Sequence, residues 1–208
     1  MKQFITRRSF IKAAGAATAL TAVSVGAPAA FAEETNCFFG DKADVTILYT
    51  NDVHTYIDNK SPKPTYAAIA ALKKSIEDTG RDVLLVDAGD HIQGTAYGSM
   101  DDGATIIELM NEAGYDIATL GNHEFDYGYD NLVNLSKEAK FPIVAANVLY
   151  QGKVAFNSNQ IFTTPSGVKI GVFGLETPET ATKAHPAKIK GVTILGDKSM
   201  FDCAQAQV

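Results

Sequence analysis

Short apolar runs alternate with longer amphipathic runs along the chain from Asp44 onward. This alternation is typical of strands and helices that follow one another along a chain, and it predicts a layered α/β domain. The run at 82–86 is almost entirely apolar, which indicates a strand covered on both faces of a sheet. The expected strands are 45–49, 82–86, 117–120 and 143–146, and the expected helices are 64–78, 104–113 and 131–139.

The texture of the sequence changes after Asn147, where turns and alternating residues take over. Further strands are expected at 160–163 and 169–174, and a hairpin around Pro165, Ser166 and Gly167 would join them. Asp197 is expected to cap a last helix, with an apolar face that runs to Val208 without a stop signal. We therefore expect that the chain is truncated at its C-terminus.

The first 32 residues have the order of an export signal. A basic start with the string Thr6-Arg7-Arg8-Ser9-Phe10-Ile11-Lys12 precedes a mild apolar run and the small-x-small site Ala30-Phe31-Ala32. The paired arginines resemble a bacterial twin-arginine signal. A membrane anchor is the alternative, but a run rich in Ala and Gly and interrupted by Pro28 is a poor spanning helix. We expect a signal peptide at 1–32, a mature N-terminal segment at 33–43 and a partial domain at 44–208. The protein is thus expected to use the Tat machinery, to be periplasmic or extracellular, and to keep no stable membrane anchor.

Two cysteines, Cys37 and Cys203, are too few for a disulfide framework, and their spacing fits no zinc knuckle. They would meet an oxidising compartment after export. Whether they pair is left open by the sequence.

Three polar clusters each follow one of the first three expected strands. Because the carboxyl ends of parallel strands lie along one edge of an open sheet, these clusters are expected to meet there. Their carboxylate, imidazole and amide groups favour Zn, Mn, Fe or Co over copper or an iron-sulfur cluster. The clusters are Asn51-Asp52-Val53-His54, Gly89-Asp90-His91-Ile92-Gln93-Gly94 and Gly121-Asn122-His123-Glu124-Phe125-Asp126.

The spacing within the clusters supports a metal site. In an extended backbone, Asp52 and His54 would point the same way and grip one ion. Asp90 is placed to present its carboxylate to two ions, and Asn122 offers an amide oxygen to the second, while His123 would face the substrate. Two ions about 3.5–4 Å apart polarise a phosphoryl group and activate a water molecule for attack.

The order of these motifs resembles that of the calcineurin-like metallophosphoesterases, and the fuller strings resemble the bacterial 5'-nucleotidase branch, from about Asp44 to Val208. The resemblance implies a layered α/β sandwich, with β-sheets flanked by helices, that is incomplete at its C-terminus here. It also implies two divalent ions. The roles that it implies are Asp52 and His54 on the first metal, Asp90 as the bridge, Asn122 on the second metal, His123 as transition-state stabiliser or acid, and Asp126 as the group that orients His123.

The chain also departs from the family pattern. The family completes its site with a later histidine and a Gly-His-x-His or Gly-His-x-Gln segment, whereas His185 is the one histidine after the third cluster. The nucleotide-binding C-terminal domain is absent as well. The expected function is hydrolysis of phosphate esters, first of all nucleoside 5'-monophosphates, although this chain alone should be inactive or nearly so. Cyclic-nucleotide and nucleotide-sugar hydrolysis stay open, as does a non-catalytic fragment that binds one metal ion.

The charge balance limits the partners. The net charge is −6, and removing the four basic residues of the signal leaves 14 basic against 24 acidic residues. Such an acidic surface gives no footprint for nucleic acid or anionic lipid, so a small phosphoester would have to be bound locally, by metal.

Several polar neighbours of the clusters have an alternative structural interpretation. Asp87 is expected to support the metal ligands as a buried hydrogen-bonded group, and Glu124 to close a local backbone hydrogen bond. His91 is equally consistent with a solvent-facing position. Tyr127 and Tyr129 suit packing under the loop better than stacking on a base.

Overall fold

The computed structural model describes residues 45–57 and 64–208. The predicted signal peptide at 1–32, the segment at 33–43 and Cys37 lie outside these residues. The elements are β1 (Val45–Thr50), α3 (Tyr66–Glu77), β2 (Asp82–Asp87), α4 (Ala96–Ser99), α5 (Ala104–Ala113), β3 (Ile117–Thr119), η1 (Asn122–Phe125), α6 (Tyr129–Glu138), β4 (Ile143–Val144), β5 (Val148–Tyr150), β6 (Lys153–Val154), β7 (Asn159–Thr163), β8 (Lys169–Phe173), α7 (Thr180–Lys183), β9 (Val192–Ile194) and α8 (Asp197–Gln205).

The central sheet is parallel and has the strand order β1-β2-β3-β4. The register pairs Val45 with Asp82 and Thr50 with Asp87, so β1 and β2 end side by side. Strand β3 pairs with β2, and β4 with β3, in the same direction. All four strands therefore deliver their carboxyl ends, and the loops that follow them, to one edge of the sheet.

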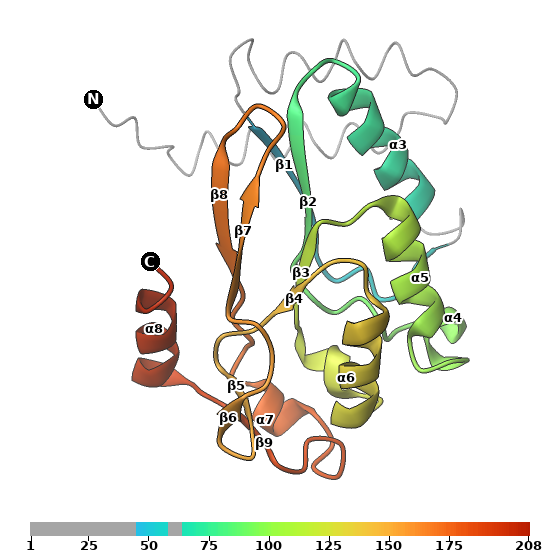
Figure 1. Ribbon diagram of the computed structural model, residues 1–208. Helices are drawn as coiled ribbons and strands as arrows, with labels where there is room; N and C mark the ends of the chain where they lie inside the picture. Colours follow the sequence, from blue (N-terminus) through green and yellow to red (C-terminus); the bar gives the residue numbers. More distant parts are fainter. Residues whose placement is uncertain (1–44, 58–63) are drawn as a thin grey trace, which may run out of the picture.

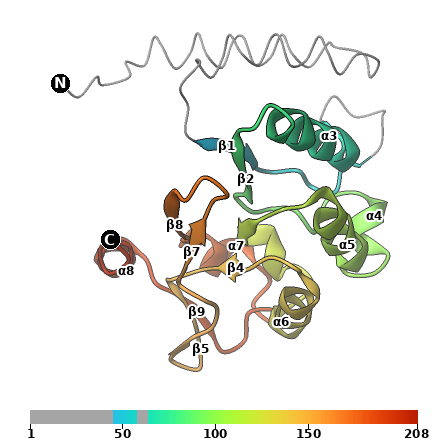
Figure 2. The same cartoon turned by 45° about the horizontal axis from the view of Figure 1, so that its top comes forward.

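Helices α3, α5 and α6 lie on the same side of this sheet in both ribbon views (Figures 1 and 2). Their apolar stripes supply much of the buried core, with Ile106, Ile107 and Met110 of α5 almost without solvent contact. Helix α3 begins at the N-cap Thr65, whose side chain accepts the N–H of Ala68. Helix α5 ends at Gly114, whose φ of 76° is a left-handed conformation suited to glycine. The predicted α/β class, with a sheet flanked by helices, is confirmed.

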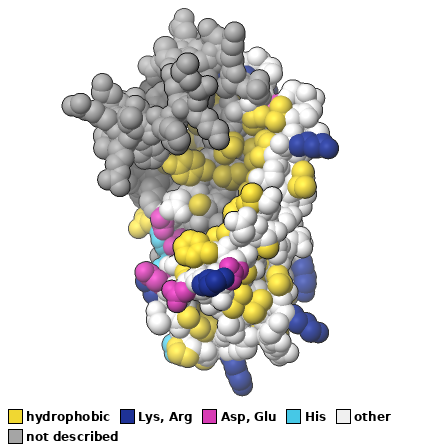
Figure 3. Space-filling model, turned by 90° about the vertical axis from the view of Figure 1, so that its left-hand side faces the viewer, with side chains coloured by type: hydrophobic (Ala, Val, Ile, Leu, Met, Phe, Trp, Pro, Cys, Tyr) yellow, Lys and Arg dark blue, Asp and Glu magenta, His cyan; other side chains and the backbone are white. Residues whose placement is uncertain are grey.

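The opposite face of the sheet is more open than the sequence suggested. Hydrophobic side chains gather on the side of the molecule away from these helices (Figure 3): Tyr49 of β1 is 71% exposed, and Ile161 of β7, which belongs to a separate two-stranded sheet, is 65% exposed. Strand β2 is covered better, because Leu84 and Leu85 are buried while Val83 and Val86 are half-buried. The cover on both faces that was expected for the strand at 82–86 therefore agrees with the burial of β2, whereas the edge strand β1 is more exposed.

The second half of the chain adds smaller sheets. Strands β7 and β8 form the predicted antiparallel hairpin, and its turn is closed by the N–H of Gly167 donating to the carbonyl of Thr164. Strands β5, β6 and β9 form a three-stranded sheet that the sequence did not predict. The last helix begins at Asp197 itself with Gly196 as its cap, so Asp197 is the first helical residue and not the cap. Cys203 in this helix is half-buried.

Candidate metal centre

The loop after β1 is bent and not extended as the sequence-based argument assumed. Asp52 and His54 have φ values of 53° and 49°, which are left-handed conformations. The bend is fixed from the neighbouring loop, because the N–H of Asp52 donates to the carbonyl of Gly89 and that of His54 to the carbonyl of Asp90. The two side chains still converge, with Asp52 Oδ1 3.5 Å from His54 Nε2. The predicted pairing is therefore reached by a different backbone route.

The ring of His54 is held in place by one of its two nitrogens. Its Nδ1 lies 3.0 Å from the carbonyl oxygen of Gln93. Because a carbonyl oxygen only accepts, Nδ1 carries the proton, and Nε2 is left with its lone pair on the side of Asp52. A second partner that fixes the tautomer in this way is typical of histidines that bind metal.

The loop after β2 brings Asp90 against the loop after β3. Gly89 has a φ of 102°, and its N–H donates to Asp87 Oδ1 at 2.9 Å. Asp90 Oδ1 then accepts the N–H of His123 at 2.9 Å. The carboxylate of Asp90 is thus tied directly to the Gly-Asn-His-Glu cluster.

His123 and Asp126 form a hydrogen-bonded pair in the short 3₁₀ turn η1 and its cap. His123 Nδ1 lies 2.7 Å from Asp126 Oδ2. Burial by itself would lower the pKa of His123, but the hydrogen bond and charge of Asp126, together with the charge of Asp90, raise this pKa above its ordinary value. The imidazole is therefore held in one orientation by Asp126.

His54, Asp90 and His123 offer ligand atoms that all lie within 4.8 Å of one another. The rings of His54 and His123 meet edge to face, with centroids 5.1 Å apart. Asp52 contacts His54 from an exposed position, and Asn122, half-buried at the start of η1, precedes His123. The structure thus brings the three predicted loops together, and the imidazole, carboxylate and amide groups that meet there suit a divalent metal ion. Which of these residues bind metal stays a prediction.

Beneath the site lies a buried charged cluster. His91 is fully buried, which settles the question that the sequence left open, and its Nδ1 lies 2.8 Å from Asp87 Oδ1 and 3.5 Å from Glu124 Oε1. Burial alone would lower the pKa of His91, but Glu124 and Asp87 raise it to about 9. Asp87 also accepts the hydroxyl proton of Thr50, so its predicted place as a buried hydrogen-bonded group is confirmed.

Tyr127 and Tyr129 pack against the hydrophobic core as partly buried residues, as the sequence favoured. Tyr129 stacks on Tyr150 with ring centroids 4.1 Å apart and also meets Phe156 edge to face. This packing connects the start of α6 to the second half of the chain.

Two glycines make the contact between the loops possible. A Cβ on Gly121 would lie 2.3 Å from Asp90 Oδ1, and a Cβ on Gly89 would lie 2.5 Å from the backbone nitrogen of Gly121.

We expect Gly121→Ala to displace Asp90 and to lower the free energy of unfolding by about 1–3 kcal/mol, as overpacking does. Urea denaturation measures the loss. Gly80→Ala is not a suitable control, because Gly80 has a positive φ; Gly171→Ala is, since a Cβ there meets nothing within 4 Å. Equal stability of Gly121→Ala and the wild type would contradict the crowding.

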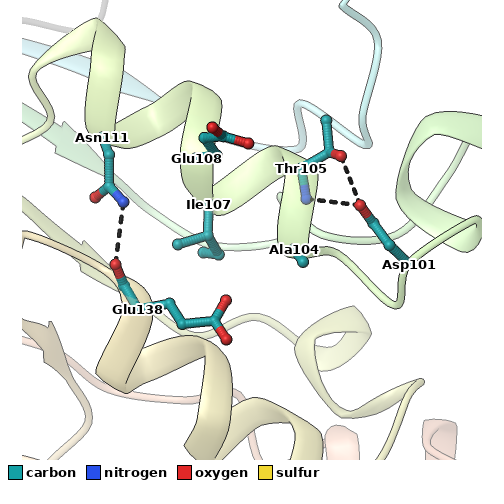
Figure 4. A pocket seen from close by; sticks show the side chains of 7 residues that line it. All are labelled: Asp101, Ala104, Thr105, Ile107, Glu108, Asn111 and Glu138. Carbon is teal, nitrogen blue, oxygen red and sulfur yellow. Dashed lines mark hydrogen bonds between the residues drawn. The ribbon is translucent and has the colours of Figure 1, made fainter.

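A groove between α5 and α6 lies apart from this site (Figure 4). Its polar side chains serve the helix ends: Asp101 Oδ2 accepts the N–H and the hydroxyl proton of Thr105, and Asn111 donates to the carbonyl of Glu138. None of the predicted site residues lines it. The hydrogen bonds of Asp101 and Asn111 thus serve the ends of α5 and α6.

Export is supported by a separate match at the N-terminus. The twin-arginine translocation signal model matches residues 5–24, so the protein carries an export signal and is directed across the membrane to the periplasm or the extracellular space. Within residues 45–57 and 64–208, no helix has the length and apolar character needed to cross a membrane.

Comparisons with known proteins agree on one family. A snake venom 5'-nucleotidase from Naja atra is 37% identical over 160 residues, which cover 69% of this chain and 30% of that protein. A 5'-nucleotidase from Vibrio cholerae is 36% identical over 155 residues, which cover 71% of this chain and 28% of that protein. The crystal structure of a 5'-nucleotidase precursor from Thermus thermophilus superimposes with a TM-score of 0.66 at 29% identity, covering 78% of this chain and 33% of that one.

The chain therefore spans about 30% of the length of the relatives that it matches. The family model described as calcineurin-like phosphoesterase matches residues 45–197, which include every predicted site residue. The chain belongs to the calcineurin-like phosphoesterase family.

Proposed function

We propose that the protein hydrolyses phosphate esters, with nucleoside 5'-monophosphates as the substrate class, and that this chain supplies part of a site for two divalent metal ions. The observation that carries the proposal is the convergence of His54, Asp90 and His123 within 4.8 Å at the carboxyl edge of the sheet. The names of the relatives from Naja atra and Vibrio cholerae, both 5'-nucleotidases, support the substrate class.

In this proposal Asp52 and His54 would hold the first ion, Asp90 would serve both ions, and Asn122 would hold the second. These residues fit divalent metal ions because they offer carboxylate, imidazole and amide groups. In the neutral ring of His54, Nδ1 donates to Gln93, so that Nε2 has its lone pair on the side of Asp52. Divalent ions of the Mn, Zn, Co or Fe class, when bound, supply Lewis-acid polarisation of the phosphoryl group and activation of water.

His123 has the properties of a proton donor to the leaving oxygen. Asp126 fixes its Nδ1 at 2.7 Å, which leaves Nε2 as the nitrogen that can donate toward a substrate. Its raised pKa keeps the ring protonated closer to neutral pH. Asp126 orients the ring and stabilises the imidazolium form.

The test is phosphate release from AMP with Mn²⁺, measured beside 2',3'-cyclic AMP and UDP-glucose. It is run on this chain and on a version extended with the remaining part of the Vibrio cholerae relative, because the family places further histidine ligands later in the sequence. We expect Mn²⁺ binding by the chain itself, and Mn²⁺-dependent release from AMP that EDTA abolishes once the extension is present. Mn²⁺ binding without phosphate release from any ester in either form would favour a non-catalytic metal-binding fragment.

A further inference from the structure

Glu124 is a buried carboxylate that serves the main chain of two separate loops. Its Oε2 accepts the N–H of Asp90 at 2.7 Å and the N–H of Gly121 at 2.5 Å. Its Oε1 accepts the N–H of His91 at 2.8 Å and that of Ile92 at 3.3 Å. One oxygen atom thus joins the loop after β2 to the loop after β3. The sequence predicted only a local hydrogen bond for Glu124, whereas three of its four partners lie 32 to 34 residues away.

This link coincides with the closest approach of the two loops. Gly89 and Gly121 are in contact there, so close that neither position has room for a Cβ. Asp90 is held twice by the β3 loop: its own N–H shares Glu124 Oε2 with Gly121, and its Oδ1 accepts the N–H of His123. The position of Asp90 relative to His123 is therefore fixed by two links, one direct and one through the carboxylate of Glu124.

Glu124 lies among other buried polar side chains. His91 lies between Glu124 and Asp87, and all three side chains are buried. Glu124 uses both of its oxygens as acceptors for backbone N–H groups, four in all. A neutral amide of the same length has one acceptor oxygen and could not replace it.

We propose that Glu124 is a positioning residue for the candidate metal centre, whose carboxylate sets the distance between Asp90 on one loop and Asn122 and His123 on the other. The inference rests on the metal site of the proposed function. Glu124 binds neither metal nor substrate and acts through the main chain of Asp90 and Gly121. Loosening it should therefore weaken metal binding while every ligand side chain is still present.

Two variants separate the reach of Glu124 from its charge. Glu124→Asp keeps the charge, but the side chain is one methylene shorter and does not span both loops. Glu124→Gln keeps the length and replaces one acceptor oxygen by a donor. Asp116→Asn is the matched control, because Asp116 also accepts a backbone N–H, that of Leu85 at 2.8 Å, and pairs with Lys73 at 2.9 Å. Its side chain bonds to Leu85 in the middle of β2 and to Lys73 in α3, away from the carboxyl edge.

Amide hydrogen exchange of the metal-free protein tests the link itself. Both Glu124 variants should lose protection at Asp90 and Gly121 by about tenfold or more, and Asp116→Asn should not change these two sites. In the wild type, the two amides should open together because they share one acceptor. Independent exchange of Asp90 and Gly121 in the wild type would overturn the link without requiring any variant to fold.

Mn²⁺ titration followed by electron paramagnetic resonance tests the positioning role. The Glu124 variants should weaken the Mn²⁺ Kd by about 10- to 100-fold and alter the spectrum of the bound ion, as loss of a supporting partner does elsewhere. Glu124→Asp with a wild-type Kd, or an equal loss in Asp116→Asn, would overturn the role. A wild type that binds no Mn²⁺ would refute the proposed metal site itself, which is a different outcome from a wild type and variants that bind equally well.

Discussion

Asp90→Asn is expected to weaken Mn²⁺ binding by about 10³-fold and to abolish phosphate release from AMP, because a carboxylate that bridges two cations contributes several kcal/mol to their binding. In the candidate metal site, a carboxylate oxygen of Asp90 lies within 4.8 Å of ring nitrogens of His54 and His123. Asparagine has nearly the same shape and keeps an oxygen for the N–H of His123, so the fold should persist. Mn²⁺ titration and a phosphate assay on the extended form measure the two losses.

The control for this variant is Asp102→Asn. Asp102 has a left-handed backbone like that of Asp90, with a φ of 54° against 59° for Asp90. Unlike Asp90, Asp102 is exposed and follows helix α4 in the sequence. We expect its Mn²⁺ Kd to equal that of the wild type. An Asp90→Asn variant that binds Mn²⁺ within threefold of the wild type would show that Asp90 is not a ligand.

Glu176→Gln is expected to raise the free energy of unfolding at pH 9 by up to about 4 kcal/mol and to change it little at pH 4. Glu176 is fully buried, its Oε1 accepts the hydroxyl proton of Thr180, and among the described residues its Oε2 has no hydrogen-bond partner. Burial raises the pKa of this carboxyl to about 8. Its folded pKa lies above its unfolded pKa, so the folded state holds an extra proton. The protein is therefore most stable below pH 4.5 with respect to this group, and stability falls as pH rises through 8.

Urea denaturation between pH 4 and pH 9, with EDTA present, measures this dependence. His91 contributes in the same direction: its folded pKa of about 9 is also raised, so its stabilisation is full below pH 6.5 and is lost as pH rises through 9. Glu176→Gln should flatten the profile between pH 5 and pH 8 and leave the His91 part. Glu179→Gln serves as the control, because Glu179 is exposed and forms an ion pair with Lys183 on the surface. An unchanged pH profile in Glu176→Gln would contradict the neutral buried carboxyl.

Long periodic segments were predicted well from the sequence. The helix expected at 104–113 is observed as Ala104–Ala113, since its apolar spacing and the terminal Gly114 both point to the same bounds. The short elements α4, η1, β5, β6, α7 and β9 were missed, because two to four residues do not establish a period. Strands β3 and β4 are as short, but they lie in the four-residue apolar runs at 117–120 and 143–146, which were predicted as strands. These elements form through contacts with distant segments of the chain, and the local residue pattern does not predict those contacts.

The candidate metal site was likewise predicted only in part from the sequence. Residue types and order predicted which loops meet at the carboxyl edge, because a parallel sheet sends its strand ends to one side. The left-handed backbone at Asp52 and His54 was not predictable, since Gly89 and Asp90 impose it from another loop. Likewise, the burial of His91 and the long-range partners of Glu124 follow from how the loops pack. His91 next to Asp90 was the one sequence signal for this buried cluster, and it did not distinguish a buried ring from an exposed one.

The most direct test of the central claim, that three loops share a pair of metal ions, is anomalous X-ray diffraction at the manganese edge from crystals of the chain grown with Mn²⁺. The account predicts anomalous peaks within bonding distance of Asp90, with His54 and Asp52 on one ion and Asn122 on the other, and the two ions about 3.5–4 Å apart. A crystal in which Mn²⁺ binds elsewhere, or in which no peak lies beside Asp90, would contradict it.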